Sequence, residues 1–160
     1  IISALGTKNI SRINHIGSTS VPGLIAKPTI DILLEIPTDA DIPSLTTALI
    51  SAGYICNMQP NNPAPHLMFM KGYTPQGFRD QAVHLHVRFP GDWDELYFRD
   101  YLRSHPETAK SYGKLKQNLQ LRYEHDRDAY TEAKTDFIHE ATRLARKEMG
   151  NKYTTPSTTL

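Results

Sequence analysis

The chain has 160 residues, of which 39% are hydrophobic and 22% are charged, and its formal net charge is +1. These values are typical of one globular domain with its own core, and the near-neutral charge excludes a general nucleic-acid or membrane-surface footprint. No run of 18 apolar residues is present, so we expect no transmembrane helix. The single cysteine, Cys56, cannot form an internal disulfide, which with the lack of a signal segment favours a cytoplasmic location. The chain opens on Ile1 rather than Met, and we expect a native segment to precede it.

The first part of the chain combines strand signals with a polar loop. Residues 1–6 are typical of the end of a helix, and the loose alternation of residues 10–16 predicts a strand. Residues 17–28 are rich in Gly, Ser, Thr and Pro, which predicts a loop. The nearly continuous apolar run at residues 29–36 predicts a central buried strand, in which Asp31 is the exception.

The middle of the chain predicts one helix and several short strands. Residues 43–52 have apolar residues at helical spacing and are followed by Gly53. Further strands are expected at residues 54–58, 66–71 and 83–89. The Gly- and Pro-containing segment 72–77 predicts a long hairpin connection between the last two of them.

The last part of the chain is helical in pattern. Helices are expected at residues 92–104, 106–125 and 128–148. Residues 151–160 are rich in Thr and Ser and predict a flexible tail. The order of elements predicts an α+β (α/β-like) fold, with a mixed sheet flanked by helices and a helical C-terminal block, as one domain over residues 1–150.

A glycine-serine turn stands before the strand that carries the carboxylate. Twelve residues separate Ser18 from Asp31. The amides and hydroxyls of such a turn approach a phosphate closely, and a carboxylate within an apolar strand is unfavourable unless it is paired or bound to a metal. We interpret Gly17, Ser18, Thr19 and Ser20 as a phosphate-binding turn, with Asp31 and Ser18 as candidate catalytic residues. The alternative is a plain turn in which Asp31 caps a loop amide.

Several segments resemble the signature of the GrpB family. The longest is His15–Ile32, and shorter similarities lie at His84–Val87, Tyr112–Lys116 and Asp126–Lys134, so that the resemblance covers roughly residues 12–140. It implies the fold of the nucleotidyltransferase-like superfamily and a helix before the first strand. Because a related domain is fused to dephospho-coenzyme A kinase in some bacteria, the resemblance also implies a functional link to that enzyme.

The sequence departs from the pattern of active nucleotidyltransferases in one respect. Those enzymes generally carry two acids in an Asp-x-Asp or Asp-x-Glu arrangement on one strand, whereas Leu33 stands at the second position here. Glu35 shares the face of Asp31 but lies roughly 13 Å further along an extended strand. The usual clamp of two carboxylates on a metal ion is therefore absent.

Histidines are the candidates to complete the site. His84 and His86 share one face of their strand, and His15 ends the first strand. If these imidazoles converge on Asp31, the four residues form a site for a divalent metal, and zinc, manganese or iron suits this donor set better than magnesium. The alternative is a polar cleft in which the histidines form hydrogen bonds without a metal.

Basic side chains supply candidates for binding an anionic ligand. These are Lys27, Lys71, Arg79 and Arg88, each of which has the alternative of a solvated surface charge. On the predicted helices, Tyr112–Lys116 and Tyr130–Lys134 are i,i+4 pairs. They either reach the cleft or form packed rings covered by lysine stems.

Three functions are consistent with these residues. The first is transfer of a nucleotidyl or phosphoryl group from a bound nucleotide, which the lack of a second acid at Leu33 weakens. The second is a non-catalytic module that binds a nucleotide, coenzyme A or another small phosphorylated ligand. The third is a metal-dependent enzyme that uses Asp31 with His84 and His86.

Overall fold

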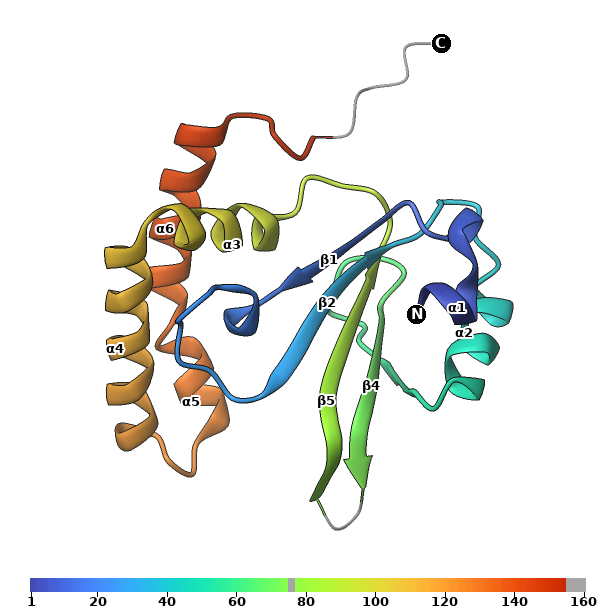
Figure 1. The fold of residues 1–160 in the computed structure, drawn as a ribbon, viewed down its shortest axis with the longest axis horizontal. Helices are drawn as coiled ribbons and strands as arrows, with labels where there is room; N and C mark the ends of the chain where they lie inside the picture. The colour runs from blue at the N-terminus through green and yellow to red at the C-terminus, as the bar shows by residue number, and fades with distance from the viewer. Residues whose placement is uncertain (75–76, 155–160) are drawn as a thin grey trace. The chain divides into compact units, whose positions relative to one another are not determined.

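The computed structural model describes residues 1–74 and 77–154, except for the side chains at positions 78–80 and 127. The chain forms two compact units (Figure 1). Unit 1 contains Ile1–Ser20 and Lys27–Gly91, and unit 2 contains Val21–Ala26 and Asp92–Thr154. Each unit has its own hydrophobic core, so each is described separately below.

Unit 1 is built on a mixed sheet. The strands of its described part are β1 (Arg12–Ile16), β2 (Thr29–Glu35), β3 (Ile55–Met58), β4 (Leu67–Thr74) and β5 (Gly77–Arg88). Their order in the sheet is β1-β2-β5-β4-β3, and β2 pairs with β5 in parallel while the other neighbours pair antiparallel. The apolar segment predicted as a buried strand is therefore β2, an interior strand between β1 and β5. The prediction of an α+β fold with a mixed sheet is confirmed.

Alternation along the strands places the core of unit 1 on one face of the sheet. Leu34, Leu85 and Phe69 are each fully buried, and they belong to one apolar cluster with Leu49 of α2. The helices of this unit are α1 (Ile2–Leu5) and α2 (Ile42–Ser51), with short 3-10 turns at Thr7–Asn9 and Ser18–Ser20. Because successive side chains of a strand point to opposite faces, the other face is left for the neighbouring residues of β2 and β5, many of which are polar.

Unit 2 consists of helices and the short segment 21–26. Its helices are α3 (Asp94–Ser104), α4 (Pro106–Arg122), α5 (Arg127–Glu132) and α6 (Thr135–Met149). One apolar cluster joins Val21 to Leu102 of α3 and to Ala109 and Tyr112 of α4. A second cluster joins Tyr97 of α3 to Ala145 of α6, so two interfaces hold the helices together.

The structure corrects two of the predicted elements. The third C-terminal helix is divided, because Asp126 caps α5 through the amide of Ala129 and the chain turns at Ala133 and Lys134 before α6 begins. Helical spacing continues across this turn, so periodicity alone does not detect it. The long hairpin connection at 72–77 is also wrong: β4 extends to Thr74 and β5 begins at Gly77, and residues 75–76 lie outside the described part.

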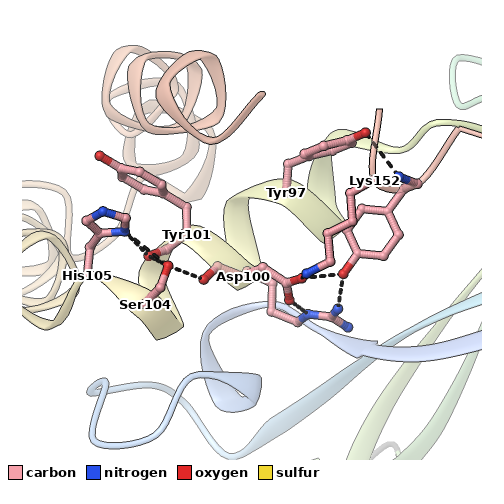
Figure 2. A network of polar contacts seen from close by, with 8 residues as sticks. Tyr97, Asp100, Tyr101, Ser104, His105 and Lys152 are labelled. Atoms are coloured by element: carbon pink, nitrogen blue, oxygen red, sulfur yellow. Dashed lines mark hydrogen bonds and ion pairs between the residues drawn. The ribbon is translucent and has the colours of Figure 1, made fainter. Parts of the chain in front are cut away.

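The segment expected to be a tail makes contacts at its start. Lys152 donates a hydrogen bond to Asp100 of α3, and Tyr153 stacks edge-on against Tyr97 with the ring centroids 5.2 Å apart (Figure 2). Residues 155–160 lie outside the described part of the chain. Within that part, no helix combines the length and the apolar character needed to cross a membrane.

Candidate functional site

The polar face of the unit 1 sheet brings Asp31 and two histidines together. Asp31 on β2 pairs in register with His84 on β5, and Leu33 pairs with His86. The Oδ1 atom of Asp31 lies 3.3 Å from Nδ1 of His84 and 3.3 Å from Nε2 of His86. The three side chains are 29%, 25% and 24% exposed, so a ligand from solvent has access to them. The sheet register therefore brings these two imidazoles to the carboxylate, which was the condition set for a shared site.

Tyr73 of β4 extends this cluster, and the sequence interpretation missed it. Its hydroxyl group is 2.6 Å from Nε2 of His84, and the two rings stack with their centroids 5.7 Å apart. The pairing of β4 with β5 shifts between Lys71 and Tyr73, at Gly72. This irregularity re-aims the following side chain towards His84. A glycine inside a strand pattern, as at Gly72, is the one signal that indicates such a bulge.

Gly72 is required at this bulge for a steric reason. Its φ angle is +87°, and a Cβ atom added there would lie 2.5 Å from the backbone oxygen of Gln81. A side chain at this position would therefore disturb the β4–β5 pairing that sets the position of Tyr73.

The Gly17–Ser18 turn lies directly against the carboxylate of Asp31. Gly17 has a φ angle of +70°, and a Cβ atom added to it would lie 2.7 Å from Oδ2 of Asp31. The 3-10 turn that follows is closed by Ser20, whose hydroxyl group donates to the carbonyl oxygen of Gly17 at 2.6 Å. Ser20 is 5% exposed and so holds the turn, whereas Ser18 begins the turn beside the carboxylate.

Two other members of the predicted site bind each other rather than Asp31. His15 pairs in register with Ile32, so its side chain points to the opposite face of the sheet from Asp31. Its Nε2 atom lies 2.9 Å from the hydroxyl group of Thr19, which donates to the carbonyl oxygen of Thr29. The expectation that His15 joins Asp31 as a metal ligand is wrong, because alternation along β1 turns it away.

The second carboxylate of β2 is held by the sheet itself. Glu35 is 1% exposed, forms an ion pair with Arg12 of β1 and accepts a hydrogen bond from the amide of Gly91. Arg88 lies beside Glu35 in the register and is only 5% exposed, so its interpretation as a solvated surface charge is wrong. Glu35 is committed to these contacts and does not act as a second acid beside Asp31.

The remaining basic candidates do not gather around Asp31 in the described part of the chain. The ammonium group of Lys71 donates to the carbonyl oxygen of Ala52 at 2.8 Å and lies 5.2 Å from the centroid of the Tyr54 ring. This contact caps the C-terminal end of α2. Lys27 is exposed in the loop before β2, and the side chain of Arg79 lies outside the described residues.

The donor set of the cluster decides which metal it fits. Within the described residues, no group of three or more His, Cys, Asp or Glu side chains meets the geometry of a preformed metal site. Magnesium prefers oxygen ligands, and of the carboxylates whose side chains the structure describes, Asp31 is the one that contacts His84 and His86, since Glu35 is paired elsewhere. One carboxylate with two imidazoles fits zinc or manganese rather than magnesium.

Comparisons with known proteins place the chain among bacterial relatives. The sequence profile described as GrpB protein matches residues 1–144. A UPF0157 protein from Pseudomonas aeruginosa is 42% identical over 128 residues, which are 79% of this chain and 52% of that protein. The glutamate-rich protein GrpB from Alkalihalophilus pseudofirmus is 31% identical over 140 residues, which are 83% of this chain and 78% of that protein.

A more distant relative carries the name of an enzyme. The dephospho-CoA kinase from Mycolicibacterium paratuberculosis is 26% identical over 156 residues, which are 84% of this chain and 38% of that protein. The chain spans about half of the Pseudomonas aeruginosa relative and 39% of the UPF0157 protein YqkA from Bacillus subtilis.

A solved structure supports the same assignment. The crystal structure of the conserved protein GrpB from Enterococcus faecalis superimposes with a TM-score of 0.76 at 31% sequence identity, and covers 92% of this chain and 86% of that one. The family match spans all of the motifs between residues 12 and 140 that resemble the GrpB signature. The chain belongs to the GrpB family.

Proposed function

We propose that unit 1 binds a small phosphorylated ligand, with a nucleotide or coenzyme A as the reference compounds, at the Gly17–Ser18 turn and the Asp31–His84–His86 cluster. The observation that carries this proposal is the close approach of Gly17 to Asp31, where a Cβ atom would lie 2.7 Å from Oδ2. A turn without a side chain brings backbone amides to the ligand. The family membership, with its nucleotidyltransferase-like fold, agrees with a phosphate ligand.

The charge of Asp31 determines what else the ligand needs. A carboxylate repels a phosphate at close range unless a positive charge lies between them. A divalent cation held beside Asp31 would supply that charge. Binding is therefore expected to depend on added metal.

The spacing of the side chains favours a metal-dependent form of this site as the second candidate. The two contacts of Asp31 Oδ1 with the imidazole nitrogens are both 3.3 Å, longer than the roughly 2.9 Å of an ordinary N–H···O hydrogen bond. Two ligands of one tetrahedral zinc ion, each bound at about 2.05 Å, lie about 3.4 Å apart. Asp31, His84 and His86 are the residues that would hold the ion, which would neutralise and polarise a bound phosphate.

Transfer chemistry receives weaker support than binding. With Leu33 in place of a second acid and Glu35 paired with Arg12, Asp31 is the carboxylate that the described residues supply to the cluster. The relative named dephospho-CoA kinase supports a ligand of the nucleotide or coenzyme class and a link to that enzyme. We therefore favour a ligand-binding module over a nucleotidyltransferase as the function of unit 1.

Thermal denaturation with a ligand panel tests the proposal. ATP, coenzyme A and inorganic pyrophosphate are each added with no metal, with magnesium, with manganese and with zinc. A ligand at 100 times its Kd stabilises the folded state by about 2.7 kcal/mol, which raises the melting temperature. We expect this rise for the wild type and for Asp39→Asn, a control in an exposed position, and its loss in Asp31→Asn. Unchanged melting across the whole panel contradicts the proposal.

Elemental analysis separates the two forms of the site. The protein is purified without a metal-binding tag, incubated with zinc or manganese and desalted. A metal-dependent site retains close to one equivalent in the wild type and loses it in His84→Gln and His86→Gln. If the protein binds the ligand but retains no metal, the site acts in its hydrogen-bonded form.

A further inference from the structure

Unit 2 contains a groove that lies between the segment 21–26 and the helices α3 and α4. Its volume is about 830 Å³, and the described residues that line it all belong to unit 2. Binding sites for small molecules usually have volumes of about 300–1,000 Å³ and mostly apolar walls with a few polar groups. The groove has the size of such a site, and the site residues proposed for unit 1 do not contribute to its lining.

Apolar side chains form most of the lining of this groove. Leu102 of α3 and Ala109 of α4 are buried, and they belong to one apolar cluster with Val21. Leu24 and Ile25 also line the groove, and Ile25 is 52% exposed. Exposed apolar side chains that gather at a hollow and are rimmed by polar residues mark a binding site. The lining therefore suits the apolar part of a ligand.

The wall formed by the segment 21–26 is held in place without a ligand. The ammonium group of Lys116, a buried residue of α4, donates a hydrogen bond to the carbonyl oxygen of Ile25. The amide of Leu24 donates to the carbonyl oxygen of Val21 at 3.2 Å, which closes a turn within the segment. Because the wall is already ordered, a ligand that enters the groove does not have to order it.

Gly113 of α4 keeps the groove open. A Cβ atom added to it would lie 3.5 Å from a methyl carbon of Leu24 and 3.5 Å from one of Ile25, which are ordinary contact distances. The residue lies inside α4, where glycine is less favourable than alanine. Neither a special backbone conformation nor a close contact requires glycine here. The space that Gly113 leaves between α4 and the segment 21–26 is therefore its main structural consequence.

The charged side chains that line the groove, among the residues the structure describes, are all basic. They are Arg103 at the end of α3, and Lys110 and Lys114 on α4, and each is exposed. Lys110 lies 4.0 Å from Glu107, and Arg103 has an interaction of its own. Lys114 is therefore the cation on which the inference relies. Its charge lies at the edge of an apolar groove, which favours a ligand with one anionic end.

We infer that this groove binds an amphipathic monoanion, an alkyl chain of medium length that ends in a carboxylate. Removal of the chain from water against the apolar walls drives binding, and Lys114 pairs with the carboxylate. A polyphosphate would contact exposed cations and leave the apolar walls uncovered, so the lining favours the carboxylate. This inference concerns unit 2 and does not rest on the proposed function of unit 1.

Amide NMR titration with decanoate, kept below the concentration at which it forms micelles, tests the site. The signals of Gly23 and Gly113, which line the groove, should shift and saturate, while that of Gly53 in unit 1 should not. Decanol should bind roughly threefold more weakly, because it lacks the charge that pairs with an exposed lysine. Acetate, which lacks the chain, should leave the signals in place.

Three results of this titration overturn the inference. The first is a lack of saturable shifts at Gly23 and Gly113. The second is equal affinity for decanol and decanoate, which would make the groove a site for a neutral apolar group. The third is a shift of the same signals with protein concentration alone, which would assign the groove to a second copy of the chain.

Filling the groove is the first test by substitution. Gly113→Met should weaken decanoate binding at least roughly tenfold, because its side chain occupies the space of the ligand. Its melting temperature should equal that of the wild type or exceed it, since methionine is a better helix former than glycine. The control is Ser111→Met, which adds the same side chain to α4 at an exposed position outside the lining. Equal decanoate affinity in the two variants contradicts the inference.

Removal of the charge is the second test, and it decides the question alone if Gly113→Met does not fold. Lys114→Gln should weaken decanoate binding roughly threefold and leave decanol binding unchanged. Lys147→Gln, at an exposed position on α6 outside the lining, should bind both as the wild type does. Asp31→Asn should also leave decanoate binding unchanged. If Asp31→Asn abolishes it and Lys114→Gln does not, decanoate binds in unit 1 and the inference about unit 2 fails while the proposed function stands.

Discussion

Asp31 in unit 1 and Asp100 in unit 2 both have close polar partners, but these partners and the exposure of the two carboxylates differ. The side chain of Asp100 is 13% exposed and accepts hydrogen bonds from Arg99, Lys152 and Tyr153 (Figure 2). Asp31 is 29% exposed and faces two imidazoles at 3.3 Å. Asp100 is surrounded by short contacts from guanidinium, ammonium and phenol donors, whereas the partners of Asp31 are two imidazoles at longer distances.

The difference distinguishes a structural carboxylate from one that is suited to a ligand. Burial by itself raises the pKa of Asp100, but the hydrogen bonds from Lys152, Tyr153 and Arg99 outweigh it and hold the pKa at about 2. Such a carboxylate anchors the end of the described chain to α3. Asp31 has long contacts and access to solvent, and these leave it able to exchange a partner for a ligand or a metal.

The largest expected effect is a difference in stability between two equivalent substitutions. Asp100→Asn removes the charge that Arg99 and Lys152 share, and breaking a buried ion pair of this kind costs about 2–4 kcal/mol. Asp31→Asn should cost less than about 1 kcal/mol, because its contacts are long and half-exposed. Urea denaturation of both variants measures the difference. Equal losses would show that the two carboxylates are both structural.

A second effect concerns the glycine beside Asp31. Gly17→Ala places a side chain at a φ angle of +70° and within 2.7 Å of the carboxylate, whereas Gly23 has a φ angle of +75° with nothing within 4 Å of its added Cβ atom. Both substitutions carry the roughly 1–2 kcal/mol of a left-handed conformation. Gly17→Ala should be more destabilising than Gly23→Ala, and it alone should abolish ligand-dependent stabilisation. Thermal melts with and without ligand check this expectation. Equal destabilisation and equal ligand response in the two variants would contradict a role for the close approach of Gly17 to Asp31.

The third effect is a dependence of stability on acidity. Because the pKa of Asp100 is lowered from 3.8 to about 2 in the folded state, its contribution is fully present above pH 4 and is lost as the pH falls through about 2. The loss amounts to about 2 kcal/mol. Denaturant melts of the wild type between pH 5 and pH 2 should show this fall, and Asp100→Asn should show a shallower one. Parallel curves for the two proteins would contradict the role of Asp100.

The smallest effect is expected at Tyr73. Tyr73→Phe removes one hydrogen bond to His84, which changes stability by about 1 kcal/mol. The ring stacking remains, so the main change should appear in the tautomer of His84, followed by nitrogen NMR of the imidazoles. His86, which contacts Asp31 and pairs in register with Met68, serves as the internal reference. If the His84 signals do not change in Tyr73→Phe, the Tyr73 hydroxyl group does not influence the site.

Local chemistry was enough to predict the candidate residues of unit 1. The position of Asp31 in an apolar run, the glycine-serine turn before it and the shared face of His84 and His86 all follow from strand alternation and turn composition. The GrpB motifs in the same segments predicted the family. The helical pattern likewise predicted α3 and α4, while the division between α5 and α6 escaped it because the turn preserves helical spacing.

Only the tertiary structure decided which of those residues meet. The parallel register of β2 and β5 places His84 opposite Asp31, although 53 positions separate the two residues in the chain. Pairing with Ile32 sends His15 to the other face, and the bulge at Gly72 brings Tyr73 to His84. Alternation is a property of each strand's own backbone, so the sequence reveals it. Register depends on packing and hydrogen bonds between distant segments, and these exist only in the folded sheet.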